Sequence, residues 1–197
     1  MPADRSLPSL RAAVQRCEAC ELYKCATQAV FGEGPSNARI VLVGEQPGDN
    51  EDVAGRAFVG PAGQLLDLAL SEAGIDRNET YITGAVRHFK FVERGKRRIH
   101  QTPRASEIAA CRPWLEAELE TIRPRVVLCM GASAAQSVLG RAVTIKNERG
   151  KLHPHASAEF VAVTVHPSSV LRAQDEAVKQ QQYELFVEDL RRAREIL

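Results

Sequence analysis

The chain has 197 residues, of which 44% are hydrophobic and 26% are charged, a composition that is ordinary for a globular protein. Its formal net charge of +1 excludes binding to nucleic acid through overall charge, so any such affinity must come from local clusters of Lys and Arg. No apolar run approaches the roughly 20 residues of a membrane span, and the N-terminus lacks a signal-peptide pattern. We therefore expect one domain, residues 1–197, in the bacterial cytoplasm, and at the nucleoid if it binds DNA.

Two cysteines near the N-terminus, Cys17 and Cys20, form a CxxC motif that follows a helical pattern at residues 6–16. In a reducing compartment this motif indicates metal ligation, iron–sulfur ligation or redox chemistry. A thioredoxin-like motif would follow a strand and open a helix, so its place after a helix favours ligation. The other three cysteines are scattered along the chain, which argues against a disulfide scaffold.

Strands alternate with helices along the rest of the chain. A β-branched run at 38–48 predicts a buried strand that ends in a Gly/Pro loop, and residues 60–75 predict a helix that ends at Gly74. The later pattern predicts a strand at 80–89, a helix at 102–124, a strand, turn and helix at 125–140, a strand and polar loop at 159–172, and an amphipathic helix at 180–197. The alternation predicts an α/β fold whose parallel sheet is covered on both faces.

Ligands of such a sheet bind beyond the carboxyl ends of its strands, and residues 44–49, 87–90, 131–134 and 166–169 leave the predicted strands there. The first segment is rich in carboxylates, which can orient water or stabilise a cationic transition state. It matches neither a Walker loop nor GxGxxG, which disfavours nucleotide binding through those motifs. In the last segment His166 could cap a loop, or it could donate to a developing anion on a leaving group.

The densest cluster of cations is residues 93–104, where five Lys or Arg residues surround His100. A segment of this kind is usually a solvated loop or an arm that contacts phosphate. In that interpretation His100 is an accidental member of the loop. In the other interpretation it reacts, because a neutral imidazole nitrogen is a nucleophile.

Six motifs carry a family resemblance: FGEGP (31–35), GEQPGDNEDVAGRAFVGPAGQLLD (44–67), KRRIH (96–100), YITGAVRH (81–88), CRPWLEAELETIRPRVVL (111–128) and HPSSVL (166–171). Together they resemble the iron–sulfur branch, the family 4 type, of the uracil-DNA glycosylase superfamily. KRRIH resembles the UdgX subgroup, whose members excise uracil from DNA and remain covalently attached through the histidine of this loop. The resemblance implies a three-layer α/β/α sandwich around a short, mainly parallel, four-stranded sheet.

The resemblance also implies a [4Fe–4S] cluster, with its first two ligands in the N-terminal segment. Cys17, Cys20 and Cys111 match three of the four cysteine positions of the family, and the fourth position falls on His88. Imidazole can replace thiolate on iron, so we expect His88 to be the fourth ligand. Cys25 is the competing candidate.

The same resemblance assigns base recognition to Phe58 and His166. Phe58 would stack on the flipped base, and His166 would donate a hydrogen bond to uracil O2 as negative charge collects there. Gln46 matches the polar loop near the sugar and base. At Gly84 the family has an asparagine that reads the uracil edge, and a glycine has no side chain to do so. The base preference is therefore expected to be relaxed or altered, or the activity weakened.

The remaining roles form two groups. The catalytic group implied by the resemblance is Glu45, Gln46, Asp49, His100 and His166. The group expected to bind DNA phosphates is Lys96, Arg97, Arg98, Arg104 and Ser168.

The expected function is excision of uracil followed by capture of C1′ by His100, so that each molecule acts once. One alternative is a conventional glycosylase with multiple turnover, in which Glu45 or Asp49 activates water. Another is a binding protein for damaged DNA that does not cleave, an alternative that Gly84 supports. The expected partner is uracil-containing DNA, with single strands tolerated, and we expect a monomer that does not bind membranes.

Overall fold

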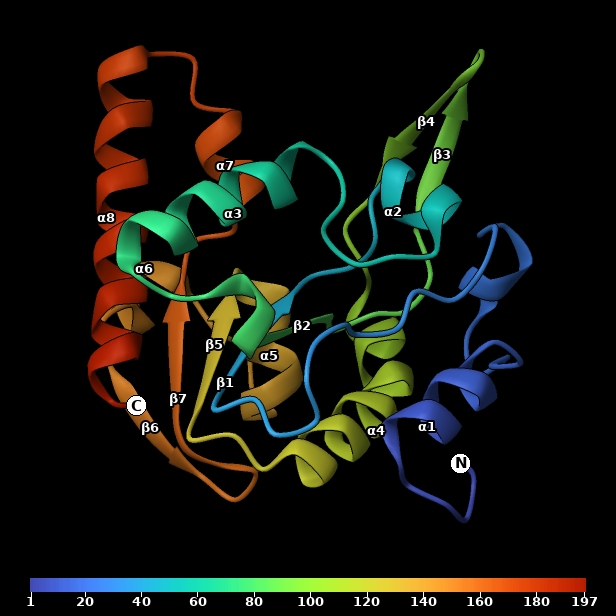
Figure 1. The fold of residues 1–197 in the computed structure, drawn as a ribbon. Helices are drawn as coiled ribbons and strands as arrows, with labels where there is room; N and C mark the ends of the chain where they lie inside the picture. The colour runs from blue at the N-terminus through green and yellow to red at the C-terminus, as the bar shows by residue number, and fades with distance from the viewer.

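The computed structural model describes residues 1–197 and has a five-stranded sheet between two layers of helices (Figure 1). The strand order is β2-β1-β5-β7-β6, and only β6 runs antiparallel to its neighbour. The strands are β1 (Ile40–Gly44), β2 (Thr80–Gly84), β5 (Val126–Met130), β6 (Leu152–His155) and β7 (Ala158–Thr164), with β3 (Phe91–Arg94) and β4 (Arg97–His100) in a separate hairpin. The helices are α1 (Leu7–Val14), α2 (Asp49–Ala54), α3 (Pro61–Ala73), α4 (Ala105–Ile122), α5 (Ala132–Leu139), α6 (Ile145–Glu148), α7 (Pro167–Leu171) and α8 (Glu176–Glu195), with 3-10 turns η1 (Glu21–Lys24) and η2 (Arg77–Glu79). No helix combines the length and the apolarity that crossing a membrane requires.

The central strands are buried on both faces, because successive side chains of a strand point to opposite sides. On one face Leu42 and Leu128 pack in a core with α3 and α8. On the other face Val43 and Val127 pack in a second core with α4 and α5. This arrangement confirms the predicted α/β class, with a mainly parallel sheet covered by helices on both sides (Figure 1).

The sheet differs from the prediction in two places. It has five strands rather than four, because β6 adds an antiparallel edge; its sequence LHPH contains a proline, which is tolerated at an edge. The strand predicted at 80–89 ends at Gly84. There the chain turns, since the backbone N–H groups of Ala85 and Val86 donate to carbonyl oxygens at the end of β1.

The segment predicted as a basic loop is an antiparallel hairpin in which Phe91 pairs with His100. Its two-residue turn begins at Gly95, whose φ of 59° lies in the left-handed region that glycine adopts without strain. The tip lies in open solvent, with no atom within 4 Å of a Cβ built on Gly95. The hairpin projects away from the sheet (Figure 1).

A fully buried ion pair joins the end of β2 to α4. Arg87 Nη2 lies 2.6 Å from Glu118 Oε2, and neither side chain is exposed. Tyr81 Oη and Thr83 Oγ1 donate to the two oxygens of Glu118 over 2.8 and 2.9 Å, and the N–H of Gly32 donates to Oε1 over 3.2 Å. The attraction within such a pair offsets its desolvation only when further hydrogen bonds satisfy the charged groups. Here three neighbours donate to the carboxylate and Thr83 Oγ1 accepts from Arg87 Nη1, whereas Arg87 Nε has no partner.

The N-terminal segment packs on α4 through a small apolar core. Leu10 and Val14 of α1 contact Phe31 and Trp114 in this core. The packing places Cys17, the first residue of the CxxC motif, beside α4.

Candidate active site

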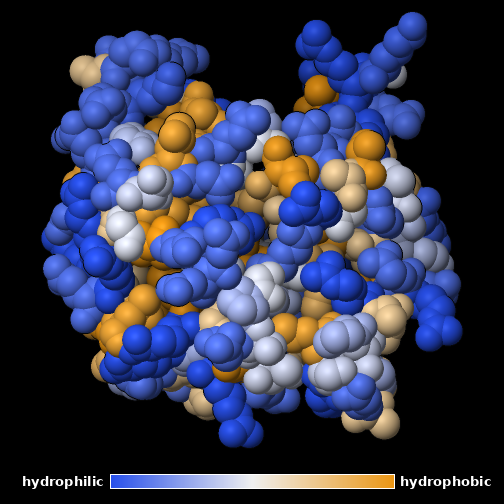
Figure 2. Space-filling model, viewed as in Figure 1, coloured by the Kyte–Doolittle hydropathy of each residue, from blue (hydrophilic) through white to orange (hydrophobic).

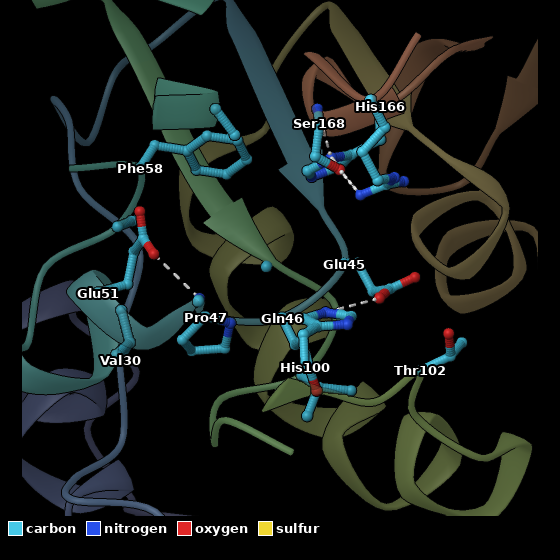
Figure 3. Close-up of a pocket in the computed structure, with 16 residues that line it drawn as sticks. Val30, Glu45, Gln46, Pro47, Glu51, Phe58, His100, Thr102, His166 and Ser168 are labelled. Carbon is cyan, nitrogen blue, oxygen red and sulfur yellow. Dashed lines mark hydrogen bonds and ion pairs between the residues drawn. The ribbon is translucent and has the colours of Figure 1, made fainter. Parts of the chain in front are cut away.

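A cavity of about 410 Å³ opens where β1, β2 and β7 end (Figure 3). Its walls come mainly from residues 45–51, 57–62, 84–86, 100–102 and 166–172. The first and last of the four loops predicted at the strand ends line it, as does the end of the hairpin. The loop at the start of α5 contacts the cavity only indirectly, through a hydrogen bond to Glu45.

Glu45, the first residue after β1, faces His100, the last residue of β4 (Figure 3). His100 Nε2 lies 3.2 Å from Glu45 Oε1, and Ser133 Oγ donates to Glu45 Oε2 over 2.6 Å. Burial acts to raise the pKa of Glu45, but the hydrogen bonds from His100 and Ser133 outweigh it and leave that pKa below its ordinary value. Glu45 is therefore an ionised acceptor for a ring proton of His100 near neutral pH.

His166, just before α7, is held as a neutral imidazole. Burial lowers the pKa of His166 to about 4, against an opposing effect of Glu45. The backbone N–H of Ser168 donates to His166 Nδ1 over 3.1 Å, so the neutral ring carries its proton on Nε2. A neutral N–H donor can stabilise a developing oxyanion without bringing a charge of its own.

Phe58 forms one wall of the cavity, with a φ of 54° that bulky side chains rarely adopt. Two glycines make room for it: a Cβ at Gly63 would overlap the Phe58 carbonyl oxygen, and a Cβ at Gly44 would lie 2.5 Å from Phe58 Cζ. The ring centroid is 6.0 Å from that of His166. A flat aromatic face and a polar donor therefore meet in one cavity, which suits a planar heterocycle.

Gly84 contributes only main chain to the cavity wall. A Cβ at this position would lie 3.1 Å from the Val86 carbonyl oxygen and 3.6 Å from the Glu45 carbonyl oxygen. A side chain would therefore need a small shift of the backbone around it. The position assigned to recognition of the base edge has no side chain with which to donate or accept.

Gln46 holds the neck of the hairpin, where Lys90 precedes β3 and Gln101 follows β4. Its Nε2 donates to the carbonyl oxygens of Lys90 and Gln101, each over 3.2 Å, and its Oε1 accepts from the N–H of Lys90 over 3.2 Å. These two partners flank β3 and β4. Gln46 lines the cavity, and its amide also orients the segment that carries His100.

Arg98 ties the hairpin to α2. Its Nη1 donates to Asp52 Oδ2 over 2.6 Å, and its Nε lies 2.5 Å from Asp49 Oδ1. Its guanidinium lies over the rings of Phe91 and Phe89, at 5.0 and 5.5 Å from their centroids. Arg98, which was expected to bind phosphate, instead clamps the hairpin to α2 through these contacts within the protein.

The carboxylates of the acidic segment after β1 lie in two places, at the hairpin and at the cavity. Asp49 does not line the cavity, although the sequence placed it in the catalytic group; it faces the hairpin instead. Glu51, a carboxylate of this segment that was not placed in the catalytic group, lines the cavity and accepts from the N–H groups of Gly48 and Gly60 over 3.0 and 2.7 Å. Its carboxylate joins the loop after β1 to the loop that carries Phe58.

The other cations expected at phosphates lie on the surface. Lys96 and Arg97 at the hairpin tip and Arg104 before α4 are exposed, and Figure 2 shows the tip as a hydrophilic projection. Arg172 was not predicted, although it directly follows the HPSSVL motif. It lines the cavity, and its Nη1 donates to Ser168 Oγ over 2.9 Å.

Of the three cysteines predicted as ligands, Cys17 and Cys20 lie in the N-terminal segment, and Cys111 lies on α4, on which that segment packs. Cys20 packs against the apolar cluster that contains Cys111. The indole N–H of Trp114 donates to Cys17 Sγ over 3.2 Å, and the backbone N–H of Arg87 donates to Cys111 Sγ over 3.3 Å. Burial raises the pKa of the Cys111 thiol to about 11. N–H donors to sulfur are among the interactions that tune iron–sulfur clusters.

His88 follows the buried Arg87 and is itself only 4% exposed. Its Nδ1 is buried without a hydrogen-bond partner, which is rare for a polar atom inside a protein. Three thiols and a free imidazole nitrogen fit the donor chemistry of an iron–sulfur cluster. As they stand, no three His, Cys, Asp or Glu side chains are close enough together to hold a metal ion, and Cys25, the competing ligand, is exposed.

Comparison with known proteins finds a family model and relatives that cover most of the chain. Residues 31–191 match the family model of the uracil DNA glycosylase superfamily. A type-4 uracil-DNA glycosylase of Thermotoga maritima is 36% identical over 185 residues, 93% of this chain and 91% of the relative. A type-4 uracil-DNA glycosylase of Pyrobaculum aerophilum is 35% identical over 173 residues, 84% and 85% of the two chains. A type-5 uracil-DNA glycosylase of the same organism is 30% identical over 181 residues, 82% and 75% of the two chains.

The substitution Arg98→Ala should loosen the hairpin without unfolding the sheet. It removes both ion pairs to α2 and the contact with the aromatic rings, which lowers the free energy of local opening by roughly 2 kcal/mol. Hydrogen exchange of the β3 and β4 amides should then quicken by roughly 30-fold. Arg97→Ala is the matched control, because Arg97 is exposed and forms no ion pair. Equal exchange in both variants would contradict the clamp.

The buried His166 should make the protein less stable in acid. The unfolded chain takes up a proton near the ordinary pKa of 6.5, whereas the folded chain does so only near 4, so stability falls as the pH drops through this window. Between about pH 7 and about pH 5 the loss from this residue is about 2 kcal/mol. His166→Asn should remove that part of the slope in urea unfolding, whereas His155→Asn should retain it. Parallel slopes for wild type and His166→Asn would show that the ring is not held neutral.

Proposed function

The chain belongs to the uracil DNA glycosylase superfamily, and from this membership we propose that it excises uracil from DNA and remains covalently attached through His100. The covalent step rests on one observation. The imidazole of His100 lies 3.2 Å from the Glu45 carboxylate at a cavity that Phe58 and His166 also line. A nucleophile and its proton acceptor are therefore next to the place where a flipped nucleotide would enter.

Excision begins with the base between Phe58 and His166. As the bond between C1′ and the base nitrogen breaks, its electron pair leaves with the uracil, and the neutral Nε2–H of His166 donates to the oxygen on which the charge collects. The sugar is left with oxocarbenium character. The ionised Glu45 and the phosphates of the DNA itself stabilise that positive charge.

Capture follows when the unprotonated ring nitrogen of His100 forms a bond to C1′ in the place of water. The N–H on the other ring nitrogen donates to Glu45, which orients the ring, and the carboxylate offsets the positive charge that the ring gains when the new bond forms. The alkylated nitrogen has no lone pair and is a poor leaving group. Each molecule would therefore act once.

DNA would reach the cavity along the exposed cations. Lys96, Arg97 and Arg104 are free to bind the phosphates that flank the flipped nucleotide, and Arg172 stands at the cavity itself. These cations form a single basic edge, which can bind the phosphates of one DNA strand, so we expect the protein to accept single-stranded DNA. We also expect it to act as a monomer.

A [4Fe–4S] cluster is also part of the proposal, held by Cys17, Cys20, Cys111 and His88. When bound, it would supply cross-links between the N-terminal segment, the exit of β2 and α4. The excision chemistry is carried by Glu45 and the two histidines of the cavity.

A second function, binding of damaged DNA without cleavage, is favoured by one observation only. Gly84 leaves the base edge without a side chain to read it. A base could then be held by stacking and by His166 alone.

A denaturing gel of the protein incubated with a uracil-containing single-stranded oligonucleotide distinguishes these functions. We expect a shifted band that survives heat and SDS. Alkali-labile nicks without a shift would indicate turnover with water, and an intact strand retained only on a native gel would indicate binding alone. His100→Ser should abolish the stable band while nicks still form, and His155→Ser should leave the band in place. A stable band in His100→Ser would refute the assignment.

The cluster is tested by iron content. Purified protein should contain about four iron atoms and show the visible absorption of an iron–sulfur centre. His88→Ala should lower the iron content, His88→Cys should keep it, and Cys25→Ser should leave it unchanged. A folded protein without iron, or loss of iron in Cys25→Ser alone, would contradict this ligand set.

A further inference from the structure

We propose that Ser133 is a positioning residue, which holds the Glu45 carboxylate in the orientation that faces His100. The inference rests on the proposed function for its consequence, since the pair of Glu45 and His100 performs the capture. The hydrogen bond itself is a property of the folded chain, so it can be tested with and without DNA.

The topology of the sheet brings Ser133 to Glu45. The parallel strands β1 and β5 are neighbours, so their carboxyl ends lie side by side. Glu45 leaves the first strand, and Ser133 is the second residue of α5, which follows the second strand. Residues 88 positions apart in the chain thus meet through Ser133 Oγ and Glu45 Oε2 at 2.6 Å.

The two oxygens of Glu45 have different partners. Oε2 accepts from Ser133, and Oε1 lies 3.2 Å from His100 Nε2. Because a carboxylate is planar, fixing one oxygen fixes the direction of the other. Ser133 is 8% exposed and His100 is much more open to solvent, so the buried hydroxyl is the stable end of this chain of hydrogen bonds.

The hydroxyl of Ser133 does not cap the N-terminus of α5. Gly131 is the N-cap of α5, and no side chain caps this helix. A hydroxyl has one proton to donate, and that of Ser133 goes to Glu45. The structure therefore assigns this hydroxyl to the carboxylate.

Loss of the hydroxyl has two effects on Glu45. Its side chain gains rotational freedom, so the oxygen that faces His100 is no longer held in place. A donor that favours the ionised form is also removed, so the pKa of Glu45 should rise. The charged or titratable groups that face Glu45 from other elements are His100 on β4 and His166 before α7, with Arg172 behind His166, and all of them remain in the variant.

The experiment compares Ser133→Ala with Ser133→Thr, which keeps a hydroxyl. Under single-turnover conditions with the uracil-containing oligonucleotide, Ser133→Ala should form the SDS-stable adduct roughly 10-fold more slowly near neutral pH. The acid limb of its pH–rate profile should move to higher pH, because Glu45 is protonated sooner. Ser133→Thr should lie within about twofold of wild type. Equal loss in both variants would show that Ser133 only fills space, and an unmoved profile in Ser133→Ala would overturn the proposal.

A second readout separates this inference from the proposed function. The pKa of the Glu45 carboxyl, followed by carbon NMR in the DNA-free protein, should be higher in Ser133→Ala than in wild type or Ser133→Thr. If wild type forms no adduct but this pKa rises, the covalent function fails and the positioning role stands. If the adduct forms but the pKa is the same in all three proteins, the positioning role fails alone.

Discussion

The buried ion pair between Arg87 and Glu118 is the constraint on which both candidate sites depend. Arg87 lies on the segment that leaves β2, and Glu118 lies on α4. Separating them would leave an unpaired buried charge, which costs several kcal/mol, so this segment is held in one arrangement against α4. Three residues before the arginine, Gly84 forms part of the cavity wall. The N–H of Arg87 itself donates to Cys111, and the next residue is His88. One internal contact therefore sets the position of a cavity wall and of the residues proposed to bind iron.

The fold class was predictable because its signal is local. A strand buried on both faces is a short apolar run, and an amphipathic helix repeats within a few turns, so the alternation of the two was visible without tertiary information. The edge strand β6 was missed because LHPH has neither pattern and pairs on one side only. The hairpin was missed because its many charged residues suggested a solvated loop. The glycine at position 95, which is typical of a tight hairpin turn, was the sequence feature that indicated the hairpin.

The members of the site were easier to predict than their contacts. Glu45, Phe58, His100 and His166 all line the cavity. Glu45 and His166 lie just beyond strands of the sheet, and Phe58 and His100 belong to the motifs that carry the family resemblance. Asp49 and Arg98 were each assigned a role toward substrate, but they pair with each other. Such pairing depends on how distant segments fold together, and residue type alone does not indicate it. Ser133 lies in the segment 131–134 that was predicted at a strand end, but its residue type did not single it out, because a serine near the start of an Ala-rich helix is common.

The hairpin is attached to the molecule at its neck and along one face, through Gln46 and Arg98, and it is free at its tip. Because the entropy of closing a loop grows slowly with its length, extra residues at Gly95 would leave the register of β3 and β4 under the control of the attached end. A peptide tag or a fluorophore inserted there would project into solvent. The architecture thus offers an attachment point for a reporter that would stay close to bound DNA without entering the cavity.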